Sequence, residues 1–286
     1  MSEQSVFLNG DFLPISEAKV SVLDRGFIFG DGIYEVIPAY GGSLFRFAEH
    51  MQRLQDSLDA IRLPNPYSLS EWQTLLGQLL PTDTGQDQSV YLQLTRGVAP
   101  REHGFPQDIK PTVFAMAQAL PAPEPQWLAC GIEAVSLPDS RWQHCNIKSI
   151  SLLANILLRQ QAMDERAMEA ILIRDGLVTE GAASNVFIVA GGTIYTPIKD
   201  QHLLPGITRD LIVELARARQ LACEETRLSE SALLKADEIW LSSSSREILP
   251  VTQLNHKPVG QGKPGPIWQK MYTIFQEYKQ KLRKPA

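Results

Sequence analysis

The stretch Cys145-Asn146-Ile147-Lys148-Ser149 precedes a predicted helix, and a second polar stretch, Glu180-Gly181-Ala182-Ala183-Ser184-Asn185, leads into an apolar run. Two more follow in order: residues 204–209 read Leu-Pro-Gly-Ile-Thr-Arg, and residues 242–245 are four serines. Each stretch alone has a plain structural explanation, namely an exposed lysine, a tight loop, a helix cap and a turn. The helix N-terminus and the serine hydroxyls each also suit an anion such as a phosphate, although neither alone specifies a ligand. The order and spacing of the lysine, the acid, the helix N-terminus and the serines are more informative than any one stretch.

The composition is that of an ordinary globular protein. Of the 286 residues, 44% are hydrophobic and 21% are charged, which is enough for one large domain or two medium ones, each with its own core. The formal net charge is -5, and the basic residues form no dense run. We therefore expect no nucleic acid and no membrane among the partners of this protein.

The cysteines and the N-terminus indicate where the protein resides. Cys130, Cys145 and Cys223 have none of the close spacings of zinc or redox sites, so we expect reduced thiols and no metal. Residues 1–4 lack the profile of a signal peptide, and no apolar run is long enough to span a membrane. The expected location is the cytoplasm.

Periodicity predicts an α/β protein of two domains. Three prolines within residues 121–125 predict an interdomain linker over 121–126, between a small domain at 1–120 and a larger one at 127–286. In the first domain we expect hairpins over 5–12 and 34–45, helices from about 47 and 70, and strands over 89–98 and 111–116. In the second we expect strands over 132–137, 170–173, 185–189, 193–196 and 238–241, with helices over 152–163, 207–218 and 267–282. Many short strands with fewer helices favour a mixed, barrel-like second domain.

Nearly the whole chain resembles the fold type IV pyridoxal-phosphate enzymes, and within them the D-amino acid transaminases. The segments that carry the resemblance are 22–35, which contains Asp24-Arg25-Gly26, and 49–54, 147–149, 180–187 and 204–209. The resemblance implies a small N-terminal α/β domain, a larger C-terminal pseudo-barrel domain, and pyridoxal 5'-phosphate as the cofactor.

The resemblance also implies roles for single residues. Lys148 matches the lysine that forms an aldimine with the cofactor and moves the substrate proton, and Glu180 matches the acid that pairs with the pyridinium nitrogen. Arg53 matches the guanidinium that binds the cofactor phosphate. The other expected cofactor contacts are the N–H groups of Ile207 and Thr208, the hydroxyls of Thr208, Ser243 and Ser244, and the side chains of Ser184 and Asn185.

The segment around Arg101 and His103 distinguishes activities within the family. Without context it reads as a polar surface loop, but the pair matches the residues that, with the tyrosine corresponding to Tyr34, bind the substrate α-carboxylate in D-amino acid transaminases. In that family the loop crosses a homodimer interface. The resemblance therefore implies a homodimer whose active site lies at the domain and subunit interface.

The expected function is transfer of the amino group from a D-amino acid, such as D-alanine, to a 2-oxo acid, such as 2-oxoglutarate. Aminodeoxychorismate lyase is the first alternative, because it shares the lysine, the glutamate and the phosphate-binding residues, and only the Arg101 and His103 pair argues against it. Branched-chain L-amino acid transaminase is the second, although residues 150–155 differ from the glycine-rich continuation typical of those enzymes. A catalytically silent dimer that holds a cofactor is the rival from another class.

Overall fold

The computed structural model describes residues 4–80 and 86–283, and the chain forms two compact units. Unit 1 comprises Met1–Pro121, Ile147–Leu152 and Leu282–Ala286, and unit 2 comprises Ala122–Asn146 and Leu153–Lys281. The short segment that carries Lys148 thus packs with the N-terminal part of the chain. The expected domain limits at 120 and 127 stay a prediction.

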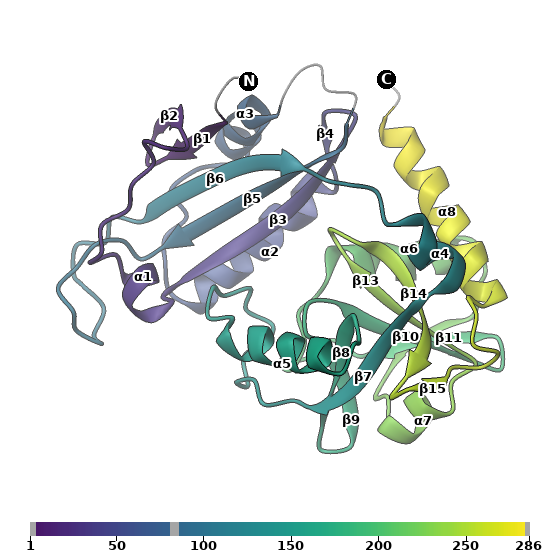
Figure 1. Cartoon of the computed structure of the whole chain (residues 1–286). Helices are drawn as coiled ribbons and strands as arrows, with labels where there is room; N and C mark the ends of the chain where they lie inside the picture. The colour runs from purple at the N-terminus through teal and green to yellow at the C-terminus, as the bar shows by residue number, and fades with distance from the viewer. Residues whose placement is uncertain (1–3, 81–85, 284–286) are drawn as a thin grey trace. The chain divides into compact units, whose positions relative to one another are not determined.

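The sheet of unit 1 is antiparallel, with the strand order β2-β1-β6-β5-β3-β4 (Figure 1). Its strands are β1 (Ser5–Leu8), β2 (Asp11–Pro14), β3 (Gly32–Tyr40), β4 (Ser43–Leu44), β5 (Gln88–Thr95) and β6 (Thr112–Ala119). Both expected hairpins are confirmed, and their turns at Asn9-Gly10 and Gly41-Gly42 have positive φ angles at both positions. Such angles are those of type I′ turns, whose twist matches that of the paired strands.

Helices α2 (Phe47–Ala60) and α3 (Leu69–Leu79) cover one face of this sheet, and the short helix α1 (Arg25–Phe29) precedes β3. Ser68 begins α3 with a capping box, in which its side chain and that of Glu71 bind each other's backbone N–H groups. The core between sheet and helices is apolar and includes Ile33, Leu54 and Trp72. Burial of this layer is what holds α2 and its polar residues at a fixed place on the sheet.

Unit 2 contains a mixed sheet with the order β12-β11-β10-β13-β14-β7-β8-β9, with β15 added to β14. Its strands are β7 (Ile132–Pro138), β8 (Glu169–Arg174), β9 (Leu177–Gly181), β10 (Asn185–Ala190), β11 (Thr193–Pro197), β12 (Cys223–Thr226), β13 (Glu238–Ser243), β14 (Glu247–Leu254) and β15 (Lys257–Pro258). Although β9 ends the order, it also contacts β10 and β11, so the sheet curls on itself (Figure 1). The expected barrel-like α/β fold is confirmed.

The helices of unit 2 are α4 (Pro125–Cys130), α5 (Leu153–Asp164), α6 (Ile207–Ala218), α7 (Glu230–Leu234) and α8 (Pro266–Leu282). The three long helices were expected, and α6 has the expected bounds. The last proline of the expected linker, Pro125, is the first residue of α4. Proline is tolerated there because a backbone N–H group in the first turn of a helix has no hydrogen-bond partner within the helix. Four strands of this unit, β9, β12, β14 and β15, were not expected from the sequence.

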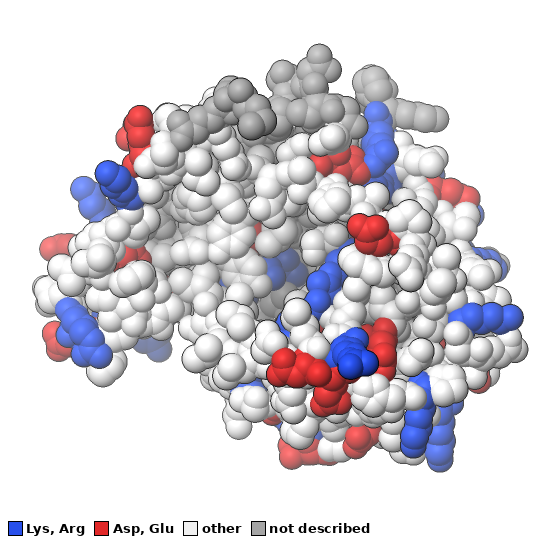
Figure 2. All heavy atoms as spheres, in the orientation of Figure 1, with Lys and Arg blue, Asp and Glu red and all other residues white. Residues whose placement is uncertain are grey.

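In the described parts of the chain, no helix has both the length and the apolar character needed to cross a membrane. On the face of each unit drawn in Figure 2, acidic and basic side chains are interspersed.

Candidate active site

Lys148 of unit 1 lies beside Tyr34 at the start of β3. Residues 147–152 form an isolated bridge with β3 between Ile33 and Ser149, and the Tyr34 N–H donates to the Lys148 carbonyl at 2.9 Å. The Lys148 Nζ atom is 4.1 Å from the centroid of the Tyr34 ring. An ammonium at this distance from a phenol ring is attracted to the ring face. The structure therefore brings together two of the predicted site residues.

A buried ionic cluster lies between β3 and α2 in the same unit. Both carboxylate oxygens of Glu35, which is fully buried, accept hydrogen bonds from Arg53: Nε donates at 2.8 Å and Nη2 at 2.7 Å. The Nδ1 atom of the buried His50 is 2.8 Å from the same carboxylate. Burial alone would raise the pKa of Glu35, but pairing with Arg53 holds it well below its usual range, whereas burial lowers the pKa of His50.

Glu35 was not among the residues predicted to belong to the site. Its partners His50 and Arg53 lie three residues apart in α2, and therefore on the apolar face that contains Met51 and Leu54. Two polar side chains on a buried helix face require a counter-charge. That requirement is the sequence signal that could have led to Glu35.

In unit 2, Glu180 lies near the end of β9 in a buried position with three partners. Its carboxylate is paired with Arg141 and accepts hydrogen bonds from Asn185 Nδ2 at 3.3 Å and from the Leu204 N–H at 3.0 Å. Burial raises the pKa of Glu180 to about 7, against the opposing effect of the Arg141 guanidinium. Such a carboxyl is poised to bind either a proton or a cationic partner near neutral pH.

Arg141 is a second residue that the sequence did not reveal. Asp139 binds its guanidinium at two atoms, with Nε at 2.9 Å from Oδ1 and Nη2 at 3.0 Å from Oδ2, and also pairs with Arg174 at 3.1 Å. The pKa of Asp139 is lowered because these cations outweigh the effect of burial. Arg141 therefore bridges two carboxylates and fixes the position of Glu180.

The other predicted cofactor residues of unit 2 gather around Asn185. Asn185 pairs with Ser242 in the ladder between β10 and β13, and a Cβ atom on Gly206 would lie only 1.9 Å from Asn185 Oδ1. Gly206 is the N-cap residue of α6 and has no side chain. The first N–H groups of the helix, at Ile207 and Thr208, therefore donate no hydrogen bond to an N-cap side chain and can bind a ligand. Asn185 is therefore next to both the row of serines and the N-terminus of α6.

The serine hydroxyls are in different states. Ser242 Oγ is buried and has no hydrogen-bond partner among the described residues, although it was not a predicted contact. Ser243 Oγ accepts from the Arg246 N–H at 3.1 Å, Ser244 is half-buried, and Ser184 Oγ is 3.4 Å from Glu169 Oε2. Ser243 and Ser184 therefore have structural partners within the chain.

These residues fit pyridoxal 5'-phosphate. The buried Glu180 suits a pyridinium nitrogen, because its raised pKa favours sharing a proton with a basic ring atom. The N-terminus of α6 and the unpartnered Ser242 hydroxyl suit a phosphate. In the described ranges of the chain, no group of three or more His, Cys, Asp or Glu side chains could hold a metal ion.

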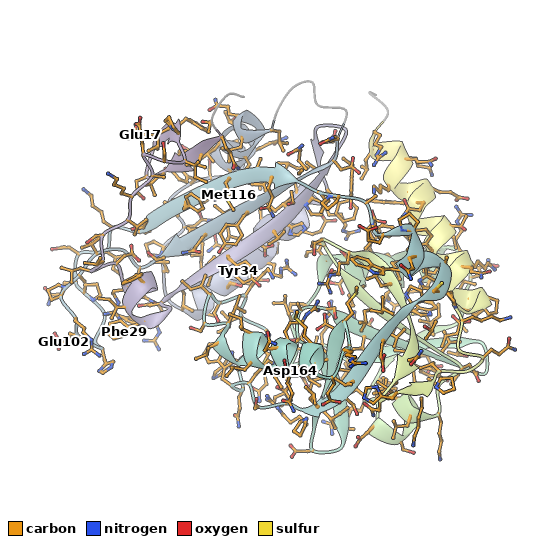
Figure 3. All side chains as sticks on the ribbon, in the orientation of Figure 1. Glu17, Phe29, Tyr34, Glu102, Met116 and Asp164 are labelled. Carbon is orange, nitrogen blue, oxygen red and sulfur yellow. The ribbon has the colours of Figure 1, made fainter. Side chains whose placement is uncertain are left out.

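The predicted carboxylate-binding residues are not brought together within unit 1. Arg101 and His103 are exposed on the loop between β5 and β6, and both pack on the Phe29 ring of α1, with His103 at 5.4 Å between ring centroids. Figure 3 shows Phe29 and Glu102 at one end of unit 1, well away from Tyr34 on β3.

Known proteins resemble this chain in sequence and in fold. A family model described as "Amino-transferase class IV" matches residues 32–254. The chain is 41% identical to a D-alanine aminotransferase of Staphylococcus haemolyticus over 96% of its own length and 97% of that protein, and 40% identical to one of Bacillus licheniformis over 95% of each.

A branched-chain amino acid aminotransferase of Escherichia coli has a similar structure, with a TM-score of 0.91, 27% identity, and coverage of 96% of this chain and 94% of that one. The resemblance inferred from the quoted segments is therefore confirmed. The family model over residues 32–254 and the near full-length relatives establish that the chain belongs to the class IV aminotransferases.

Proposed function

We propose that this chain transfers the amino group of a D-amino acid such as D-alanine to a 2-oxo acid such as 2-oxoglutarate, with pyridoxal 5'-phosphate as cofactor. The near full-length likeness to D-alanine aminotransferases carries the proposal. The likeness to a branched-chain aminotransferase covers as much of the chain at lower identity, so that activity is the second candidate.

Lys148 is the proposed proton carrier. When bound, the cofactor supplies an electron-accepting ring that takes up the electron pair left when the substrate Cα loses its proton. Lys148 Nζ holds and returns this proton, and the Tyr34 ring beside it orients the amine. Glu180, kept in place by Arg141, binds the ring nitrogen.

We assign phosphate binding to backbone N–H groups, hydroxyl groups and one guanidinium group. The N–H groups of Ile207 and Thr208, with the hydroxyls of Thr208, Ser243 and Ser244, supply donors from unit 2. Arg53 supplies a charge-assisted contact from its guanidinium group. Asn185 and Ser184 support the ring site.

Purified protein loaded with pyridoxal 5'-phosphate tests the assignment. It should convert D-alanine and 2-oxoglutarate to pyruvate and glutamate, identified by chiral chromatography, and should act poorly on L-leucine, L-valine and aminodeoxychorismate. Lys148→Ala should abolish turnover, whereas Lys19→Ala, at an exposed lysine of the same unit, should not. Efficient use of L-leucine without D-alanine would instead assign the branched-chain activity, and no turnover of any substrate would favour the silent dimer.

A homodimer completes the proposed site. Arg101 and His103 pack on Phe29, and Figure 3 shows Glu102 of the same loop at the end of unit 1 away from Tyr34, so we infer that the loop of a second copy completes the carboxylate site. In unit 2, Leu153, Ile156 and Leu157 form an apolar stripe on α5 that is at least 60% exposed at each residue. Such a stripe on a globular protein marks a surface that a partner covers.

Complementation between two inactive variants tests this arrangement. Lys148→Ala lacks the proton carrier, and Arg101→Leu lacks the carboxylate contact. If the loop acts across subunits, mixed dimers contain one intact site, and random exchange should restore about a quarter of the wild-type activity. No recovery after proven subunit exchange would place the loop in its own subunit's site.

We propose a cytoplasmic location, consistent with three free cysteines.

A further inference from the structure

The loop that carries Arg101 and His103 has no regular secondary structure, yet a single buried side chain binds its backbone. Arg25 Nη1 donates to the Glu102 carbonyl at 2.5 Å and to the Gly104 carbonyl at 3.3 Å, and Nη2 donates to the His103 carbonyl at 3.4 Å. Arg25 is only 4% exposed, whereas the loop side chains are exposed. One guanidinium thus turns three successive carbonyls inward.

We propose that Arg25, held by Asp31, is a positioning residue that presets the loop over residues 101–105 for the substrate carboxylate, and this inference rests on the proposed function. A loop that is already ordered spends less binding free energy on ordering when the ligand arrives. Arg25 itself contacts neither the cofactor nor the substrate in this proposal.

Asp31 connects the loop to the body of unit 1. Its Oδ2 atom accepts from Arg25 Nε and from Arg96 Nε, each at 2.8 Å. Arg96 Nη2 in turn donates to the Ile61 carbonyl, which follows α2, at 2.7 Å. The pKa of Asp31 is lowered because the two guanidinium groups outweigh the effect of burial, so this carboxylate stays ionised at neutral pH.

Two aromatic rings complete the support of the loop. The Arg96 guanidinium lies 3.7 Å from the centroid of the Phe105 ring, which fixes the far end of the loop. The Phe29 ring lies 4.9 Å from the Arg25 guanidinium and 5.5 Å from that of Arg101, and it also contacts His103. Phe29 therefore orders the two side chains that are to bind the carboxylate, while Arg25 orders the backbone between them.

Arg25→Lys is the decisive variant, because an ammonium keeps the charge but cannot reproduce the planar donor set that binds Asp31 and the three carbonyls. In the loaded enzyme, KM for D-alanine should rise at least tenfold, with a smaller change in kcat and less than a twofold change in the cofactor dissociation constant. Arg62→Met, at an exposed arginine of unit 1, is the matched control and should leave all three values unchanged.

D-Alaninamide, which lacks the carboxylate charge, separates positioning from general damage. The ratio of kcat/KM for D-alanine to that for D-alaninamide should fall at least tenfold in Arg25→Lys, since only the charged substrate uses the loop. A general loss of structure would lower both values and leave the ratio unchanged, which would overturn the proposal. If Arg25→Lys fails to fold, Phe105→Ala, at an exposed position, should lower the same ratio about threefold or more, and an unchanged ratio there would also overturn it.

Trypsin supplies a readout that does not depend on activity. Cleavage after Arg101 in the loaded wild-type enzyme should be slow, and it should be at least fivefold faster in Arg25→Lys and unchanged in Arg62→Met. Equal cleavage rates in wild type and Arg25→Lys would refute the positioning role. A wild-type enzyme that ignores D-alanine would refute the proposed function instead, and the trypsin comparison would still decide whether Arg25 holds the loop.

Discussion

Replacing Glu35 by glutamine should strongly destabilise the cofactor-free protein. The side chain is fully buried and accepts two hydrogen bonds from Arg53 and one from His50, all at 2.7 to 2.8 Å. Removing one partner of a buried ion pair costs about 3–5 kcal/mol, because the other charge stays buried without compensation. Glutamine keeps one acceptor oxygen, so we expect about 3 kcal/mol, a large part of the roughly 5–15 kcal/mol that stabilises a typical domain.

The pH dependence of this difference has a defined sign. Pairing with Arg53 lowers the pKa of Glu35 below its ordinary value of 4.5, so the carboxylate contributes its full stabilisation above about that pH. The contribution is lost as the pH falls through the lower pKa of the folded state. The gap between wild type and Glu35→Gln should therefore be constant between pH 7 and 8 and should narrow below pH 4.5.

Urea denaturation followed by far-UV circular dichroism measures both quantities. Glu49→Gln is the matched control, because Glu49 is in α2 beside the cluster but its side chain is 43% exposed, whereas that of Glu35 is fully buried. A Glu35→Gln variant that loses no more stability than Glu49→Gln would show that the buried cluster does not hold β3 against α2.

Three further changes have expected outcomes. Burial raises the pKa of Glu180 to about 7, so between about pH 5 and 7 the folded apoprotein keeps a proton on this carboxyl group that the unfolded chain loses. The unfolding free energy of the wild type, measured relative to that of Glu180→Gln, should therefore fall by about 1 kcal/mol per pH unit over this range. A difference between the two proteins that stays constant with pH would argue against the raised pKa. Gly206→Ala should weaken cofactor binding at least tenfold in equilibrium dialysis, since the new Cβ would lie 1.9 Å from Asn185 Oδ1, and unchanged binding would remove α6 from the site. Gly97→Ala should lower the unfolding free energy by more than about 1 kcal/mol in urea, because the residue has φ +87° and the new Cβ would meet the Lys110 carbonyl at 1.9 Å; full stability would contradict the close approach of these two chain segments.

Local signals explain which parts of the fold could be predicted from the sequence. Paired glycines and Asn9-Gly10 mark hairpins because they tolerate positive φ, and apolar periodicity marks the long helices. The strand β9 follows Asp175-Gly176, which is a turn signal of the same kind, so the sequence does contain a local signal for this strand. The sequence does not indicate β14, because Pro250 lies within it and proline is rarely found in a central strand. Pro250 pairs with Trp240 of β13 but lies just outside the ladder with β7.

The residues of the proposed site could be predicted from the sequence only in part. Lys148 and Glu180 stand out through their flanking residues, but the groups that hold the site residues in place come from distant parts of the chain. Arg53 and Glu35 are 18 residues apart, and Arg141 and Glu180 are 39 apart. Arg96 and Asp31 are separated by 65 residues. No local pattern pairs such residues, because only the strand register and the helix packing bring them within hydrogen-bond distance.

Strand β3 shows how the register does this. Successive side chains of a strand point to opposite faces, so Ile33, Glu35 and Ile37 share the face that packs on α2, and Tyr34 lies on the other. The apolar neighbours of Glu35 bury it where Arg53 and His50 arrive from the helix, while Tyr34 remains available to the amine of Lys148. A shift of one residue in the pairing of β3 with β5 would exchange the two faces and place a phenol among the helix cations and a carboxylate beside the lysine. The same hydrophobic alternation that stabilises the sheet therefore also assigns the acid to structure and the tyrosine to the proposed chemistry.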